Sequence, residues 1–153
     1  VRCLACFRSS EFKKSSGVDI VLQYDPSFLE IKPLKRNELT GTVIMGNAIS
    51  DAKQKEVKVN PHDFLNTQIS SFDTFPYMKA ATSNGIVTFS ALAKPLTEIR
   101  GKVPVASLTF KAVRRGNTKI NLVFDGGTTK DSNVAYLGKD ILEEVHGVDL
   151  KVQ

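Results

Sequence analysis

Side chains that build most catalytic and metal sites are scarce in this chain. Its 153 residues include two cysteines, two histidines and no tryptophan. Cys3 and Cys6 form a single C-x-x-C pair, whereas a zinc site needs further ligands at close spacing. His62 and His146 lie far from that pair in sequence, and residues 7–16 do not supply the βα unit of a redox motif. The sequence therefore disfavours a metal centre, a redox site and histidine-dependent catalysis.

Long apolar runs and clustered charges are also missing. No stretch approaches the ~18 consecutive apolar residues that would cross a membrane. The net charge is +5, but the basic residues are scattered, and the densest pairs, Lys13-Lys14 and Arg114-Arg115, are short. Nucleic-acid binding would need a basic stripe or stacking aromatic rings, so we expect no nucleic-acid partner. The chain begins with Val1 rather than methionine, which is typical of a fragment or a processed protein.

The acidic residues form no recognisable catalytic motif. Pairs of carboxylates for sugar hydrolysis can be nominated among the 16 Asp and Glu residues, yet no motif marks one pair. Motifs for nucleotide binding and zinc proteolysis are absent. Residues 125–133 (DGGTTKDSN) offer oxygens to calcium, with Asp125 and Asp131 as the candidate ligands, but not in the order of an EF-hand loop. A polar turn is the favoured interpretation, and we expect no catalytic residue, no metal and no cofactor.

Alternating apolar residues dominate what is present. Residues 18–24 have the period of a strand with one buried face, and Asp25-Pro26 ends that run because proline cannot donate to a sheet. Asn84-Gly85 lies between two further strand-like runs and predicts a hairpin. More strands are predicted at residues 105–113, 119–124 and 148–152. Short strands without βαβ alternation favour an all-β sandwich. The residues expected in its core are Val18, Ile20, Leu22, Tyr24, Leu29, Ile86, Phe89, Leu108, Phe110, Ile120 and Leu122.

Two segments fit this pattern poorly. Residues 1–16 are predicted to be an irregular leader, so the domain is expected to span residues 17–153. If the first strand of the sandwich is missing, its neighbour has an open edge, which would allow a weak homodimer. Residues 32–66 are more polar and weakly patterned, with short strands expected at residues 40–46 and 55–59.

Several segments taken together resemble cohesin-type domains. The similarity lies in residues 17–31 (GVDIVLQYDPSFLEI), 72–77 (FDTFPY), 85–93 (GIVTFSALA), 105–113 (VASLTFKAV) and 130–142 (KDSNVAYLGKDIL). The resemblance implies a jelly-roll β-sandwich of about nine strands, in a superfamily shared with carbohydrate-binding modules. The family normally has a regular strand before the first of these segments. Either that strand is absent here, or the irregular leader is a poor substitute for it.

The resemblance also implies where a partner would bind. Asp19 lies on the face of its strand that contacts dockerin modules in cohesins, and Asp73 and Tyr77 fall in a segment similar to the partner-binding strand. These three residues are therefore the candidate partner-binding residues. Alternatively, Asp73 caps a turn and Tyr77 packs inside the sandwich. Leu92 or Ala93 stands where the family commonly has a glutamate, so dockerin specificity of the familiar type is not implied.

The predicted function is that of a non-catalytic binding module in an extracellular or cell-surface protein, and not an enzyme. Its partner would be a dockerin-like protein module or a polysaccharide. Sugar-binding sites usually display aromatic rings, and the chain has three tyrosines, of which Tyr24 is assigned to the core by the resemblance. A protein partner is therefore favoured over a sugar. The alternative is a structural spacer or adhesin domain, which the sequence does not separate from a binding module.

Overall fold

Antiparallel β-strands make up nearly all of the regular structure. A computed structural model of the chain describes residues 2–8, 14–34, 57–126, 128 and 130–153, and it describes only the backbone of residues 2–8 and 57. The strands are β1 (Arg2–Arg8), β2 (Gly17–Tyr24), β3 (Leu29–Lys32), β4 (Val57–Val59), β5 (Met78–Ala81), β6 (Ile86–Leu92), β7 (Lys102–Ala112), β8 (Gly116–Leu122), β9 (Asn133–Tyr136), β10 (Lys139–Asp140) and β11 (Val148–Val152), and one 3₁₀ helix, η1, spans Pro61–Asp63. Among these residues, no helix has the length and apolar character needed to cross a bilayer.

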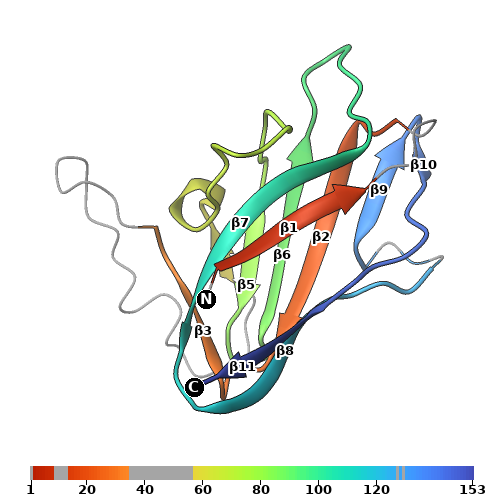
Figure 1. Cartoon of the computed structure of the whole chain (residues 1–153). Coiled ribbons are helices and arrows are strands. Elements are labelled where there is room, and N and C mark those ends of the chain that lie inside the picture. The colour runs from red at the N-terminus through yellow and green to blue at the C-terminus, as the bar shows by residue number, and fades with distance from the viewer. Residues whose placement is uncertain (1, 9–13, 35–56, 127, 129) are drawn as a thin grey trace, which may run out of the picture.

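The strands form two layers that pack face to face (Figure 1). The small sheet has the order β1-β7-β3, and the large sheet has the order β10-β9-β2-β6-β5-β4, with β8 joining β2 to β11. Strand β2 lies in the middle of the large sheet because it pairs with β6 along one edge and with β9 and then β8 along the other. The predicted all-β sandwich is confirmed.

The core lies between the two sheets, where apolar side chains leave water. The predicted core residues are buried except at two positions. Leu122 is half-buried and packs against the core. Ile86 was assigned to the wrong face: it lies opposite Gln23 and points away from the small sheet, whereas Val87 and Phe89 are fully buried. The error arose because this strand carries apolar residues on both faces near its start, so alternation alone did not identify the buried one.

The corner after β2 is closed by hydrogen bonds within it. The Asp25 carboxylate accepts hydrogen bonds from the Ser27 hydroxyl (2.6 Å) and the Ser27 backbone N–H (2.8 Å), and these bonds lower the pKa of Asp25. Tyr24 is buried, as predicted, and its ring meets Phe110 edge-on at 5.1 Å between centroids. Burial, reinforced by the negative charge of Glu30, raises the pKa of the Tyr24 phenol to about 12.

The hairpin predicted at Asn84-Gly85 joins β5 to β6. Gly85 has a φ of 64°, in the left-handed region that glycine adopts most readily. Its carbonyl accepts the Tyr24 N–H at 2.8 Å, and a Cβ at this position would lie only 1.9 Å from the Tyr24 carbonyl oxygen. The backbone of the turn therefore packs directly against the corner that ends β2, and a side chain has no room there.

The N-terminal segment corrects the prediction for residues 1–16. Residues 2–8 form β1, which pairs antiparallel with β7 across a register shift between Ala5 and Cys6. The expected irregular leader is therefore wrong for this segment, and the first strand is not missing. The pairing could not be read from local pattern, because its partner strand lies far along the chain. The expected domain bounds, residues 17–153, stay a prediction.

The weakly patterned segment is described only in part. The strand expected at residues 55–59 is present at β4, which pairs with β5. The strand expected at residues 40–46 lies outside the described residues.

Candidate protein-binding face

The large sheet has an outer face that is turned away from the core. Side chains alternate along β2, so Asp19 and Gln23 point outward while Val18 and Ile20 are buried between the sheets. The outer face consists of Asp19 on β2 and of side chains on the neighbouring strands. These side chains lie directly beside Asp19, or an even number of residues further along their strands, on the side of the sheet turned away from the core.

Strand register arranges this face in an upper, a middle and a lower row, about 7 Å apart along the strands, with Gln23 and Ile86 beyond the lower row. The upper row, at the end of the sheet near the β6–β7 loop in Figure 1, consists of Thr74, Leu92, Gly17 and Ala135. The middle row consists of Tyr77, Ser90, Asp19 and Asn133. The lower row consists of Lys58, Lys79, Thr88 and Val21.

Asp19 occupies the centre of the middle row. It lies directly opposite Ser90 on β6 and Asn133 on β9. Its carboxylate accepts a hydrogen bond from the Ser90 hydroxyl, which holds it in place, and the side chain is only half-buried. The carboxylate therefore keeps accessible surface with which it could accept a charge-assisted hydrogen bond from a partner.

Tyr77 lies at one end of the same row, immediately before β5. Its carbonyl accepts the Ser90 N–H at 3.2 Å, which places it next to Ser90 in the sheet. The side chain is half-buried and is not part of the core cluster, so the alternative that it packs inside the sandwich does not describe it. The Lys79 ammonium lies 5.9 Å from the centre of the ring, a distance compatible with cation–π attraction.

Asp73 lies at the upper edge of the face rather than in the middle row. Its N–H donates to the Leu92 carbonyl at 2.9 Å, which fixes the segment before β5 alongside the end of β6. The carboxylate is exposed and lies 3.7 Å from the Lys94 ammonium. The structure thus brings Asp19 and Tyr77 into one row and places Asp73 at its margin. Their role as partner-binding residues stays a prediction.

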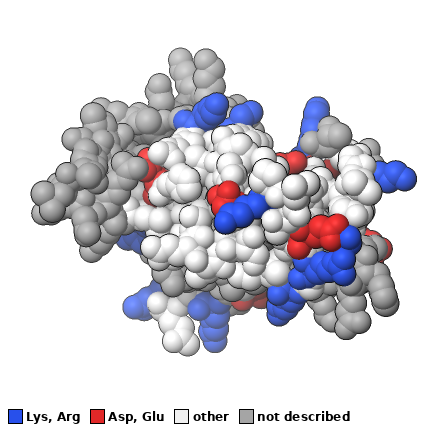
Figure 2. Space-filling view, turned by 90° about the horizontal axis from the view of Figure 1, so that it is seen from above, with Lys and Arg blue, Asp and Glu red and all other residues white. Residues whose placement is uncertain are grey.

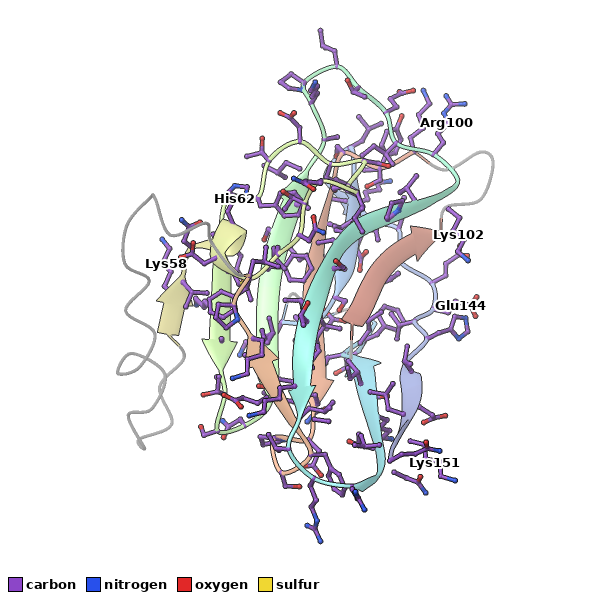
Figure 3. All side chains as sticks on the ribbon, turned by 60° about the vertical axis from the view of Figure 1, so that its left-hand side comes forward. Lys58, His62, Arg100, Lys102, Glu144 and Lys151 are labelled. Carbon is purple, nitrogen blue, oxygen red and sulfur yellow. The ribbon has the colours of Figure 1, made fainter. Side chains whose placement is uncertain are left out.

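The lower row is basic where it crosses β4 and β5. Lys58 and Lys79 lie directly opposite each other across these strands, and Figure 3 shows Lys58 at the margin of the sheet. Val21, at the other end of the row, is buried even though it points outward. The outer face therefore changes along the strands from an apolar upper row through a polar middle row to a basic lower corner.

Exposed leucines at the upper end are features that sequence reasoning missed. Leu92 in the upper row is 45% exposed, Leu137 in the β9–β10 turn is 80% exposed, and Leu96 in the β6–β7 loop is fully exposed. Figure 2 shows that the surface at this end is largely uncharged, with acidic and basic groups next to one another. The one sequence signal that pointed here was that Leu92 or Ala93 stands where cohesins commonly have a glutamate.

One of the two candidate calcium ligands, Asp131, is engaged by its own loop. Asp131 is buried, and its carboxylate accepts the Asp125 N–H at 2.6 Å and the Thr128 hydroxyl at 3.0 Å. These bonds are those of a polar turn.

His62 meets the Phe75 ring edge-on, with 6.3 Å between centroids, and His146 lies 3.5 Å from Glu144.

Metal-binding geometry is not found in the described part of the chain. No group of three or more His, Cys, Asp and Glu side chains lies close enough together there to hold an ion. The expectation of no metal and no cofactor stays a prediction.

Comparison with known proteins finds similarity in structure but not in sequence. No family model matches the chain, and no curated protein is significantly similar to it. A type II cohesin domain from the cellulosome of Acetivibrio cellulolyticus aligns with a TM-score of 0.56 and 12% identity, covering 97% of this chain and 84% of that one. A type II cohesin–X-dockerin complex from the same organism gives 0.53 and 13%, with coverages of 94% and 81%.

A third structure agrees with these two. The second type II cohesin module of the adaptor ScaA scaffoldin of Acetivibrio cellulolyticus gives a TM-score of 0.52 and 14% identity, covering 92% of this chain and 80% of that one. Identities this low establish common architecture and leave the binding partner of this chain to be inferred from its own surface. The chain has the fold of type II cohesin domains.

Proposed function

We propose that this chain is a non-catalytic binding module that recognises a dockerin-like protein module through its outer face. The observation that carries the proposal is the middle row, in which Asp19 on β2, Ser90 on β6 and Tyr77, immediately before β5, lie side by side. A solved structure with the same fold is a cohesin in complex with an X-dockerin module. Shared fold and a suitable surface therefore point to the same class of partner.

The chemistry of the row suits a protein partner. Tyr77 combines a rigid ring with a hydroxyl, a combination enriched among residues that dominate binding energy at interfaces. Asp19 is fixed by Ser90, so little side-chain entropy is lost when a partner donates to it. Leu92 adds exposed apolar area beside the polar row. Apolar and polar groups in close alternation are typical of protein interfaces.

A polysaccharide fits this face less well. Sugar rings usually stack on exposed aromatic side chains, and the chain has no tryptophan and three tyrosines. Tyr24 is buried, and both Tyr77 and Tyr136 are half-buried. The face therefore offers no broad aromatic platform.

We also propose an extracellular or cell-surface location. The supporting observation is that the similar structures include modules of cellulosome scaffoldins. The spacer or adhesin alternative would hold if no partner engages the face.

The test is binding of recombinant dockerin modules, including the X-dockerin of the Acetivibrio cellulolyticus type II complex, measured by calorimetry. The double variant Asp19→Ala/Tyr77→Ala should weaken binding by about 100-fold or more, because it removes two central contacts. Its melting temperature should stay within a few degrees of the unmodified domain, since neither side chain belongs to the core cluster.

The control is Asp149→Ala, an exposed acidic residue on β11, which should bind normally. Unchanged affinity in the folded double variant would exclude the outer face. Retention on insoluble cellulose or xylan without dockerin binding would instead favour the polysaccharide.

A further inference from the structure

Two leucines at the upper end combine exposure with an unfavourable backbone conformation. Within the described part of the chain, Leu96 (φ 64°) and Leu137 (φ 49°) are the non-glycine residues with positive φ. They are also the two most exposed large apolar side chains there. Leucine is disfavoured at positive φ, where its Cβ crowds the backbone, and it is disfavoured in water as well. Each position therefore carries two separate costs that no internal packing offsets.

Asparagine or glycine would be the expected residue at these positions. The β9–β10 turn places Leu137 and Gly138 at positive φ in succession, the arrangement of a hairpin turn that normally contains Asn-Gly. Asparagine or glycine would be more stable than leucine at these exposed positions. Backbone strain that is kept at such a site is therefore a reason to look for function.

Both leucines lie just beyond strands of the outer face. Along β9, Asn133 is in the middle row and Ala135 in the upper row, and Leu137 lies two residues beyond Ala135, in the turn that follows the strand. Along β6, Ser90 is followed by Leu92, and the loop beyond that strand carries Leu96. The β6–β7 loop and the β9–β10 turn lie at the same end of the sandwich (Figure 1).

The upper row between these strands is open and apolar. Gly17 separates Leu92 from Ala135 in the row, and the Leu92 side chain lies over it, since a Cβ there would be 2.9 Å from the Leu92 Cδ2 atom. The upper row thus places exposed apolar surface of Leu92 at the end of the sandwich that carries the two leucines, with the Lys94–Asp73 ion pair at its edge.

Charged groups near the tips are largely neutralised within the domain. Lys94 faces Asp73, and Glu98 pairs with both Lys14 and Arg100. Figure 3 shows Arg100 in the β6–β7 loop. These paired groups carry charges of both signs, and Lys139, two residues after Leu137, is exposed as well. The two leucines add apolar contact to this mixed surface.

We propose that Leu96 and Leu137 are apolar anchors that extend the outer face over the upper end and insert into apolar surface on the dockerin-like partner. This inference rests on the proposed function, because the partner is the one bound by the middle row. The reason for choosing this occupant over a membrane or a second copy of the chain is position: Leu92 and Ala135, in the row next to the middle row, lie four and two residues before the two leucines.

The decisive variant is Leu96→Asn/Leu137→Asn. Asparagine tolerates positive φ better than leucine, so the double variant should be at least as stable as the unmodified domain while it binds dockerin modules about 100-fold more weakly, or about 10-fold for each leucine. Binding that falls while the melting temperature holds or rises separates an anchoring role from a structural one. The matched control is Val113→Asn, which removes an exposed apolar side chain after β7 and should leave affinity unchanged.

The outcomes separate the two proposals. Unchanged dockerin binding in the leucine variant, with binding lost in Asp19→Ala/Tyr77→Ala, would overturn the inference and leave the proposed function standing. Loss in the leucine variant alone would support the anchors and overturn the middle row as the site. No binding by the unmodified domain to any dockerin module would overturn both. Leucine-dependent binding to vesicles of phosphatidylglycerol and phosphatidylcholine, or leucine-dependent dimerisation in sedimentation, would overturn the choice of occupant.

Discussion

The two ends of the sandwich meet the same backbone requirement with different residues. At the lower end, the left-handed position of the β5–β6 turn is Gly85, whose backbone packs against the Tyr24 carbonyl. At the upper end, Gly101 and Gly138 also have positive φ, but Leu96 and Leu137 occupy left-handed positions as well and project into solvent. Glycine removes strain and allows close packing, whereas leucine accepts strain and presents apolar area. The lower end therefore has the features of a structural joint, and the upper end those of a display surface.

The largest effect should come from adding a methyl group at the lower end. Gly85→Ala places a Cβ 1.9 Å from the Tyr24 carbonyl oxygen at a φ of 64°, so both the turn and the corner must shift. We expect a loss of about 3–5 kcal/mol in the free energy of unfolding, measured by denaturant titration.

Gly101→Ala is the matched control for that substitution. Its φ is 76°, but nothing lies within 4 Å of the added Cβ, so only backbone strain of about 1–2 kcal/mol remains. Equal losses for the two variants would mean that close packing at the lower end contributes nothing.

The lower end should also respond to alkaline pH. The pKa of Tyr24 is about 12 in the folded domain and near 10 in the unfolded chain, so the folded state holds the phenolic proton more tightly. This contribution to stability is complete below pH 10 and is lost as the pH rises to about 12. The shift corresponds to about 2–3 kcal/mol.

Unfolding midpoints in urea between pH 9 and pH 12 would measure that loss. Tyr24→Phe has no phenol to ionise, so its stability should fall less steeply across this range. Parallel curves for the two proteins would contradict the assignment of the pH response to Tyr24.

The smallest effect is expected at the upper end and has the opposite sign. Leu137→Asn should raise the free energy of unfolding by up to ~1 kcal/mol, because asparagine is less strained at positive φ. Leu92→Asn, in a regular strand of the same exposed surface, should give no such gain. A stability loss in Leu137→Asn would show that this side chain packs against the domain and is not displayed for a partner.

Much of the lower end and the centre of the fold could be predicted from local pattern. Alternation along residues 18–24 predicted β2 and its outward Asp19, and Asp25-Pro26 predicted the corner. Asn84-Gly85 predicted the hairpin, although the link between β5 and β6 includes residues 82–85. Each of these features depends on neighbours in sequence, which is why residue order was sufficient.

Features that depend on distant partners were not predictable in this way. The leader segment became β1 only because β7 provides a pairing edge. The buried side of β6 was misassigned at Ile86, since packing against the small sheet, and not the pattern, selects that side. The upper-end leucines carried no signal because leucine is not a residue typical of positive φ.

The amino-acid order alone determined that the chain is an all-β sandwich with few catalytic side chains, because strand periodicity and turn residues are encoded over a few neighbouring positions. It also identified Asp19, Asp73 and Tyr77 as candidates through their resemblance to cohesin segments. Only the tertiary structure decided that Asp19 and Tyr77 share one row, with Asp73 at its edge and two leucines beyond it. That decision needed the register of β2, β5, β6 and β9, and register is set by core packing between segments that are far apart in the chain.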